Sequence, residues 1–558
     1  MTDLPKNNPS LSAPSATRRW RFGQLSAAEL LLHLQRHLLT SNQQANWQLT
    51  WLNNDGRAVI GLLPKVSWSV YPITTVSTVS DSPLYQVITT CRDTQTSSSH
   101  DMSYADWQAE LIAYSEHHHF LANHSLAKNN ADQTLNDEPR YQHGLMGFIG
   151  YDIGSQALSP HADIDCAAQP AAVLGHYDIY LTAMSNEQGW ELHTVSEQIQ
   201  PDSNTELNNL QSLALTTIVE CLNTLDTALS MTNNFQELEN GVAPLVLTPK
   251  WQKSDYQQAF DQTQHYLVQG DCYQINLTQA WQGRLNSFKP NSNAVTNLID
   301  YLPALHRNTQ APFAGYMGLT QAEPKHVKSI KNLTHSNSIR FELLSCSPEL
   351  FFTFITDKQI GSHHIRTKPI KGTRPRSTNE VQDLLLKQQL IDSAKDRAEN
   401  VMIVDLLRND LGKYAQVGSV RVPQLFAIES FSNVHHMVST ITAELKPNTH
   451  PLAVLFGSLP AGSITGTPKK RAVEIIAELE NAARGAYCGT MGYMNFDGSG
   501  QWNVLIRTLQ ANRLADGESQ VSLWAGGGIT IASDCNDEYQ ECLDKVGNLL
   551  SILAQPTE

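Results

Sequence analysis

The segment Pro369-Ile370-Lys371-Gly372-Thr373 places one lysine amine between a residue that restricts the backbone and a residue that frees it. Proline fixes the approach of the chain, and glycine lets the backbone come close to a ligand. Lys368, Arg374 and Arg376 are near this amine along the chain, and like charges favour its neutral, nucleophilic form. Lys371 is therefore a candidate nucleophile, whereas most lysines are only solvated surface charges.

Two acidic segments further along the chain predict helices that present carboxylates on one face, because residues three or four apart are neighbours on a helix. They are Asp396 and Glu399 in residues 396–410, and Glu538, Glu541 and Lys545 in residues 537–545. If the two helices converge, their oxygen atoms suit Mg²⁺, which usually takes one or two protein carboxylates plus water and substrate oxygens. Neither helix has the Cys and His pattern of zinc. Two solvated helix faces are the alternative.

Two glycine-containing segments add backbone amides and hydroxyl groups. Ser463 and Thr465 precede Pro468, which is suited to the first turn of a following helix whose amides could receive an anion. The glycine spacing of this segment does not fit a nucleotide-binding loop. Gly526-Gly527-Gly528 follows an apolar strand at residues 521–524 and would let backbone amides approach the carboxylates, although a glycine triplet is equally compatible with a turn.

Six segments occur in the order found in the chorismate-utilising enzymes, and the chain resembles that family over residues 144–547. They are residues 369–373, 396–412, 460–469, 484–489, 506–508 and 538–545, with further similarity upstream at residues 147–152 and 270–277. The first 140 residues match poorly. The resemblance implies an α+β fold in which large antiparallel sheets pack as a sandwich with peripheral helices, the chorismate site lying in the carboxyl-terminal part.

The residue at position 371 separates the branches of this family. Anthranilate synthases, which aminate chorismate ortho to the ring carboxylate, have Ala in the lysine position, so Lys371 favours para amination. Isochorismate and salicylate synthases carry a general-base lysine where this chain has Gln274, and a neutral amide cannot take a proton from water. The resemblance therefore implies conversion of chorismate and ammonia to 4-amino-4-deoxychorismate, a step toward p-aminobenzoate and folate, through a covalent lysine intermediate.

The resemblance also implies a role for each site residue. Lys371 attacks the ring, and Glu349 protonates the leaving hydroxyl, for which apolar strands at residues 343–344 and 351–352 would keep it protonated. Mg²⁺ is held by Glu399, Glu538 and Glu541, with Asp396 acting through water. Substrate contacts are implied for Arg507, Tyr487, Gln274, Thr373, His436, Ser463, Thr465, Gly526, Gly527, Gly528 and Lys545.

Three of these assignments have structural alternatives. Arg507 would clamp the pyruvyl carboxylate of chorismate, but it could be a surface ion pair; its apolar neighbours at residues 504–506 favour an inward-facing strand. Tyr487 would donate to the same carboxylate, or it could be a satisfied core tyrosine in a strand. His436 matches the active-site histidine of the family, but it is equally compatible with a structural histidine, and His435 beside it blurs the assignment.

A partner follows from what the chain lacks. An enzyme that releases ammonia from glutamine usually needs a cysteine nucleophile in a tight elbow, and no cysteine here has a Gly-x-Cys-x-Gly setting. The sequence therefore predicts a separate glutamine amidotransferase subunit (component II), with free ammonium supporting the reaction alone. The resemblance also raises a tryptophan bound in the amino-terminal part, as an inhibitor or as a structural ligand, and both readings stay open.

Composition limits the other classes of partner. The net charge of -15 disfavours nucleic acid, and no apolar run approaches the roughly 18 residues of a membrane span. The amino terminus is polar and has no apolar signal core. Eight scattered cysteines without metal spacing indicate a reduced, cytoplasmic protein.

The chain divides into two predicted parts: residues 1–240, an amino-terminal anthranilate-synthase-like domain with polar insertions and a linker, and residues 241–558, the chorismate-binding catalytic domain. In the first part, the patterns predict strands at residues 47–51 and 66–70, helices around residues 109–114 and 207–229, and loops at residues 93–100 and 129–140. His117-His118-His119 is interpreted as a solvated helix end. Residues 323–340 are expected to form a surface insertion.

Three rival functions remain at this point. Anthranilate synthase component I would make the ortho product. A metal-dependent hydrolase could use the same carboxylates with a metal-bound water, but it would not need Lys371. A non-catalytic chorismate-binding regulatory protein would be free to lose Lys371, Glu349 and the four metal acids, and all of these are present.

Overall fold

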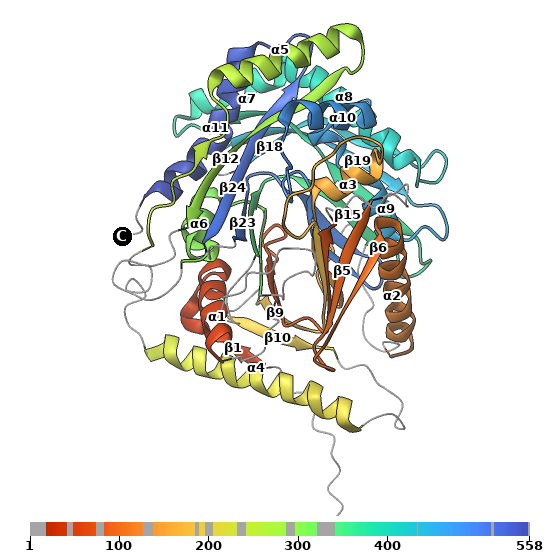
Figure 1. Ribbon diagram of the computed structural model, residues 1–558, viewed down its shortest axis with the longest axis vertical. Helices are drawn as coiled ribbons and strands as arrows, with labels where there is room; N and C mark the ends of the chain where they lie inside the picture. The colour runs from red at the N-terminus through yellow and green to blue at the C-terminus, as the bar shows by residue number, and fades with distance from the viewer. Residues whose placement is uncertain are drawn as a thin grey trace, which may run out of the picture.

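The computed structural model describes residues 18–41, 48–73, 83–125, 138–184, 189–195, 205–231, 242–285, 296–320, 341–431, 434–514 and 518–555. Within these residues, two large antiparallel sheets form the body of the molecule, and helices surround them (Figure 1). The predicted α+β class with antiparallel sheets is therefore confirmed.

The first sheet has twelve strands, and strand β20 (Gly466–Thr467) joins it by pairing with β12. The order of the others is β1 (Arg18–Trp20), β10 (Trp190–Thr194), β9 (Ile179–Ala183), β3 (Val59–Leu62), β2 (Gln48–Leu52), β13 (Phe313–Leu319), β14 (Phe341–Ser347), β23 (Thr508–Arg513), β24 (Ser519–Ile529), β12 (Gln274–Leu285) and β11 (Thr248–Pro249).

The second sheet also has twelve strands, and strand β18 (Arg421–Ser430) joins it by pairing with β19. The order of the others is β17 (Ile370–Pro375), β19 (Val434–Glu444), β16 (His363–Lys368), β15 (Leu350–Thr356), β22 (Gly500–Val504), β21 (Thr490–Asn495), β7 (Gly144–Ile149), β8 (Ala172–Tyr177), β4 (Val66–Pro72), β5 (Leu84–Cys91) and β6 (Thr96–Ser103).

The helices lie at the periphery, as expected. In Figure 1, α2 runs beside β6, α1 and α4 lie near β1 and β10, and α5, α7, α8, α10 and α11 gather at the end where β12 begins and β24 ends. The bounds are α1 (Ala27–Ser41), α2 (Tyr104–Ser125), α3 (Tyr151–Leu158), α4 (Thr205–Met231), α5 (Lys253–Gln269), α6 (Leu302–Thr309), α7 (Glu380–Asp392), α8 (Ala394–Gly412), α9 (Pro451–Ser458), α10 (Lys469–Glu480) and α11 (Cys535–Ala554).

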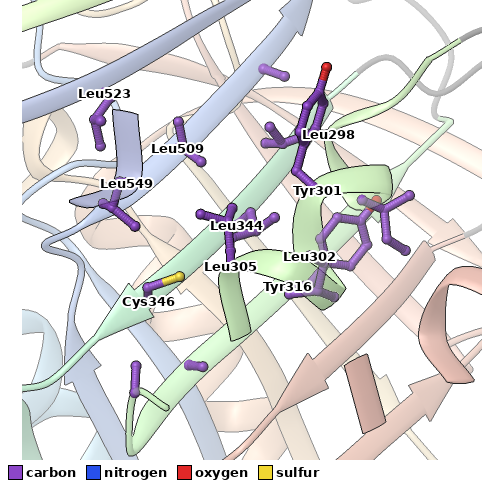
Figure 2. Packing of buried hydrophobic residues seen from close by; sticks show 14 of the residues in the cluster. Leu298, Tyr301, Leu302, Leu305, Tyr316, Leu344, Cys346, Leu509, Leu523 and Leu549 are labelled. Atoms are coloured by element: carbon purple, nitrogen blue, oxygen red, sulfur yellow. The ribbon is translucent and has the colours of Figure 1, made fainter. Parts of the chain in front are cut away.

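The central strands carry buried apolar side chains on both faces, because successive residues of a strand point to opposite sides. Met317 of β13 and Met146 of β7 belong to a shared cluster that also contains residues of both sheets, so the sheets pack on each other. Tyr316 and Leu344 instead join the cluster beneath α6 and α11, where they lie among Leu305, Leu509, Leu523 and Leu549 (Figure 2). The molecule is thus a two-sheet sandwich with helices outside.

Both sheets contain strands from the two predicted parts of the chain. β2 pairs with β13 in one sheet, and β7 pairs with β21 in the other. The division into residues 1–240 and 241–558 stays a prediction about the sequence, and the two parts do not form separate sheets. One consequence is that packing in the amino-terminal part supports strands of the carboxyl-terminal part.

Local predictions in the first part had mixed outcomes. Strands β2 and β4 and helices α2 and α4 appear where the patterns placed them. The predicted loop at residues 93–100 is wrong in its second half, since β6 begins at Thr96 and pairs with β5 despite its polar side chains. His118 is buried within α2 and stacks on Phe496, so the solvated helix end is wrong for this residue, whereas His117 beside it is exposed. Residues 323–340 and most of residues 129–140 lie outside the described residues.

Two further expectations can be compared with the described residues. All eight cysteines are free, and six are buried, as expected for reduced core residues. No helix among the described residues combines the length and the apolar composition needed to cross a membrane.

A buried ion pair connects segments in which the chain passes from one sheet to the other. Arg92, in the turn after β5, donates to both carboxylate oxygens of Asp178 (2.8 and 2.9 Å) and to the Leu63 carbonyl oxygen (2.9 Å). Leu63 lies between β3 and β4, and Asp178 lies between β8 and β9, so each marks a crossing from one sheet to the other.

We expect Asp178→Ala to lower the free energy of unfolding by about 3 kcal/mol, because it removes one partner of a buried guanidinium without removing the charge. Denaturant unfolding followed by tryptophan fluorescence measures the change. Asp405→Ala is the matched control, since Asp405 pairs with Arg408 on the surface and its side chain is 67% exposed. Equal effects of the two substitutions would contradict the role of the buried pair.

Candidate active site

Strand β17 carries Lys371 at the edge of the second sheet, next to a left-handed glycine. Gly372 has φ 79°, and a Cβ atom there would lie 2.7 Å from Leu390 Cδ1 and 2.8 Å from Asp396 Cγ. The register between β17 and β19 shifts between Ile370 and Thr373. The glycine thus allows the close backbone approach that the sequence predicted, here toward α7 and α8.

The positive residues near Lys371 do not form the uncompensated cluster that the sequence suggested. Each has its own carboxylate: Lys368 Nζ lies 2.5 Å from Glu429 Oε1, Arg374 Nη2 lies 3.1 Å from Asp396 Oδ2, and Arg376 Nε lies 2.9 Å from Asp383 Oδ1. The three charges are therefore compensated by carboxylates of their own. Asp396, one of the four predicted metal acids, is thus paired with Arg374.

Helices α8 and α11 do converge, and each begins with a side-chain cap. Ser393 Oγ accepts from the Asp396 amide, and the Asp534 carboxylate accepts from the amides of Asn536 and Asp537. The two helices meet at Lys395, whose Nζ lies 3.4 Å from Glu538 Oε1 and 4.0 Å from Glu399 Oε1. Acids 139 positions apart in the sequence thus share one lysine.

Strand β24 brings Gly527 against the acids of α11. A Cβ atom on Gly527 would lie 3.0 Å from Glu538 Oε2 and 3.6 Å from Glu541 Oε1. Lys545 Nζ donates to the Gly526 carbonyl oxygen (2.7 Å) and lies 2.6 Å from Glu541 Oε1. The triplet is part of a strand paired with β12 and is not a turn, so the turn alternative is wrong.

Gln274 lies on the other side of this strand. It begins β12, is 1% exposed, and has no hydrogen-bond partner for either atom of its side-chain amide among the described residues. A Cβ atom on Gly528 would lie 2.2 Å from Gln274 Nε2. Because a buried amide without partners is costly, this side chain is a candidate for contact with a ligand.

Burial and nearby charges shift the pKa of two of the acids, Glu399 and Glu541. Burial is the largest influence on Glu399 and raises its pKa, aided by Glu538 and Glu541 and opposed by Lys371 and Lys395. Burial acts in the same direction on Glu541, but Lys545 and other lysines outweigh it, so the pKa of Glu541 is lowered. Lys371 therefore lies close enough to both carboxylates to stabilise their charged forms.

Glu349 lies between β14 and β15 and is 8% exposed. Burial raises the pKa of Glu349 to about 7, against the opposing effects of Lys371, a hydrogen bond with Ser463, and Lys545. A carboxyl group with this pKa can hold a proton near neutral pH and release it to a reacting oxygen. Lys371 is close enough to Glu349 to act on the pKa of its carboxyl group.

A second group of predicted residues adjoins the first through β17. Thr373 Oγ1 and His436 Nδ1 are 2.9 Å apart. Burial and then Arg507 lower the pKa of His436 to about 4, which keeps the imidazole neutral. His435 instead contacts Ser430 and Asp383, so the two adjacent histidines have different surroundings.

The strand settings predicted for Arg507 and Tyr487 were wrong. Arg507 has φ 52° and lies in the connection between β22 and β23, not in a strand. Tyr487 lies in a turn, where it is 4% exposed and stacks on Trp524. Thr465 Oγ1 donates to the carbonyl oxygens of Ala461 and Gly462 in its own loop. The substrate contacts of Arg507, Tyr487 and Thr465 stay predictions.

The donor set was tested for its fit to Mg²⁺. Among the described residues, no group of three or more His, Cys, Asp or Glu side chains is arranged to hold a metal ion as the side chains stand. The oxygen chemistry of Glu399, Glu538 and Glu541 is nevertheless right for Mg²⁺. Lys395, which was not predicted from the sequence, contacts two of these acids, Glu399 and Glu538. Its position four residues before Glu399 could have indicated this contact, because such residues are neighbours on a helix.

Comparison with known proteins identifies the family of this chain. The family model for chorismate binding enzymes matches residues 86–551. The chain belongs to the chorismate-binding enzymes. Aminodeoxychorismate synthase component 1 of Escherichia coli (strain K12) is 36% identical over 426 residues, which are 75% of this chain and 79% of that protein.

Two further relatives extend the comparison to another reaction of the family. Anthranilate synthase component 1 of Aquifex aeolicus (strain VF5) is 28% identical over 421 residues, 74% of this chain and 75% of that protein. The solved structure of anthranilate synthase component I from Streptococcus pneumoniae TIGR4 has a TM-score of 0.61 at 20% identity, covering 88% of this chain and 91% of that one. The chorismate-binding enzymes thus share the fold described here.

The close approach of Gly527 to the acids leads to a first prediction about turnover. We expect Gly527→Ala to reduce chorismate consumption by about tenfold or more, because the added carbon would displace the Glu538 carboxylate. Steady-state assays of chorismate loss measure the effect. Gly547→Ala is the control: nothing lies within 4 Å of a Cβ atom at that position in α11. Full activity of Gly527→Ala would argue against a role for the Glu538 position.

The protonation of Glu349 leads to a second prediction. Because its pKa is raised to about 7, the acid form is present below that pH and is lost above it, so kcat/KM for chorismate should fall about tenfold per pH unit on the alkaline side. A pH profile of the enzyme measures this fall. Glu349→Gln, which cannot titrate, should be slow and should lack the fall; if the fall persists, another group causes it.

Proposed function

We propose that this chain aminates chorismate at the carbon para to the ring carboxylate and forms 4-amino-4-deoxychorismate. This is the activity for which the E. coli relative is named. The observation that carries the proposal is the position of Lys371, which lies close enough to Glu349, Glu399 and Glu541 to shift the pKa of each. A primary amine beside a protonated carboxyl group is suited to covalent catalysis with acid assistance.

In the first step, the neutral nitrogen of Lys371 forms a bond to ring carbon 2. The two conjugated double bonds of the ring shift, and the bond from carbon 4 to its hydroxyl oxygen breaks. Glu349 gives its proton to the departing oxygen, which leaves as water. Two displacements replace one difficult substitution, since the hydroxyl group is a poor leaving group on its own.

In the second step, ammonia forms a bond to carbon 4, and the two double bonds return to their original positions as the bond between carbon 2 and Lys371 breaks. The proton released by the incoming ammonia goes to Glu349, which restores the acid for another cycle. Lys371 leaves as the free amine. Ammonia and chorismate therefore give 4-amino-4-deoxychorismate and water, with the enzyme unchanged.

The charges of the site support a divalent cation as the cofactor. Glu399, Glu538 and Glu541 face Lys371, Lys395 and Lys545, so the carboxylates and lysines nearly balance. Chorismate adds two carboxylates, and Mg²⁺ would offset them. We assign Glu399, Glu538 and Glu541 to this ion, which when bound would anchor the ring carboxylate. Asp396 would act only through water, since Arg374 already contacts it.

Arg507 is the proposed partner of the second substrate carboxylate. Burial lowers its pKa, yet a guanidinium remains charged, and it lies near the neutral His436. The amide of Gln274 and the backbone of residues 526–528 would complete the contacts to substrate, with Lys545 and Ser463 holding their carboxylates in place. We retain Thr373, Tyr487 and Thr465 only as residues that shape the walls.

A second subunit would supply the ammonia. The E. coli relative is named as a component 1, which agrees with a chain that lacks a cysteine elbow for glutamine hydrolysis. We propose a glutamine amidotransferase as the other component, and a cytoplasmic location that suits the free cysteines.

The principal alternative is ortho amination. The Aquifex relative carries an anthranilate synthase name, but its identity is lower over a similar share of the chain. Lys371 is the residue that favours para amination, because direct ortho addition of ammonia at carbon 2 would compete with the lysine for the same carbon.

The decisive experiment supplies the purified chain with chorismate, ammonium and Mg²⁺ and separates the products by chromatography. We expect 4-amino-4-deoxychorismate at high ammonium without any partner. Lys371→Ala should lose at least about a hundredfold in rate or divert the product, because the covalent route is removed. Mass spectrometry of the enzyme under turnover should detect substrate attached to Lys371.

Lys368→Ala is the matched control, since Lys368 lies three residues earlier and is paired with Glu429. It should retain most of the activity. Anthranilate as the main product of the parent would replace this proposal with the alternative. An unchanged rate and product for Lys371→Ala, together with no adduct, would remove the nucleophilic role.

A further inference from the structure

Lys395 occupies the space between two acids that belong to different helices. Its Nζ atom lies 3.4 Å from Glu538 Oε1 and 4.0 Å from Glu399 Oε1, so it bridges α8 and α11. The acids are largely buried, with side chains 3% and 17% exposed, whereas the lysine side chain is 55% exposed. The carboxylates are therefore held by the fold, and the ammonium group reaches them from solvent.

The contacts of Lys395 are mainly electrostatic. Partial burial alone would lower its pKa, but attraction to Glu538 and Glu399 outweighs burial and the pKa is raised. Glu538 Oε1 also accepts from Ser533 Oγ at 2.7 Å, so one of its oxygens already has two partners. In this arrangement the positive charge that the two acids require comes from the chain itself.

We propose that Lys395 is an internal counter-ion that competes with the divalent cation for Glu399 and Glu538 and must turn away when the cation binds. The inference rests on the metal assignment of the proposed function. Two positive ions within a few ångströms of each other repel strongly in a partly buried site. A long, half-exposed lysine can move its ammonium into water, whereas the two acids cannot leave.

The competition has a measurable consequence. Removing the lysine charge should make the empty site less stable and should make the metal bind more tightly, because no ammonium has to be displaced. A lysine that only joins the two helices predicts the reverse for binding: its loss would loosen the carboxylates and weaken the metal. The sign of the change in metal affinity thus separates the two roles.

The experiment titrates the full chain with Mn²⁺, as a spin-active substitute for Mg²⁺, and measures free Mn²⁺ by electron paramagnetic resonance without substrate. We expect Lys395→Gln to lower the dissociation constant roughly threefold to thirtyfold. Lys395→Arg keeps the charge and should stay within about twofold of the parent. Lys387→Gln on the neighbouring α7 is the matched control for loss of a nearby positive charge, and it should have little effect.

Thermal unfolding gives a second readout. Lys395→Gln should unfold at a lower temperature than the parent without metal, and saturating Mn²⁺ should raise its unfolding temperature by more than it raises that of the parent. Unchanged or weaker Mn²⁺ binding by Lys395→Gln would overturn the competition. An equal gain in affinity for Lys387→Gln would overturn it as well, because the effect would then be general and not local.

Glu538→Gln distinguishes this failure from failure of the metal assignment. If the parent binds Mn²⁺ and Glu538→Gln loses that binding, the metal site stands, and the Lys395 variants test the competition alone. If Glu538→Gln binds as the parent does, the cation is elsewhere, and both the metal assignment and the inference are overturned.

Discussion

The attraction between buried carboxylates and the lysines that face them is the interaction on which the site depends. Glu399 and Glu538 come from two helices and are largely buried, so each would be costly to bury alone, whereas the side chain of Glu541 is 49% exposed. Lys395 and Lys545 contact them directly, and Lys371 acts on Glu399 and Glu541 at longer range. The balance lets a region of high charge lie beside the apolar core. Because chorismate would add two negative charges and a divalent cation two positive charges, both could bind together with little change in the net charge of the site.

The sheets leave space for these charged and polar side chains, because glycines occupy the strand positions that face them. Gly527 of β24 lies against the two acids of α11, and Gly528 lies against Gln274 of β12. A methyl group at either position would take the space of a functional side chain. The glycines cost conformational entropy, but pairing with β12 along the whole strand restrains them. The same pairing sets the distance between the amide of Gln274 and the carboxylates.

A second buried ion pair supports the site from behind. Arg484 is 1% exposed and contacts Glu480 at 2.7 and 2.6 Å. Its guanidinium also donates to the carbonyl oxygens of Ile464, beside Ser463, and of Asn276 in β12. One side chain thus joins the strand that carries Gln274 to the loop that carries Ser463. Since Ser463 in turn contacts Glu349, the position of the acid depends on packing that lies well away from it.

Helical spacing and strand alternation determined much of this protein from the sequence alone. The faces of α8 and α11, the caps that begin them, and the alternating strands follow from contacts between residues a few positions apart, which the local sequence specifies. The identity of Lys371 and Glu349 as an amine and an acid is likewise written in the chain. Only the tertiary structure decided which charges meet: Lys368, Arg374 and Arg376 have carboxylates of their own, whereas Lys395 reaches Glu538, 143 residues away. The tertiary structure also placed Tyr487 and Arg507 in connections and not in strands. Coulomb attraction and burial act through space, so they do not depend on how far apart two residues lie along the chain.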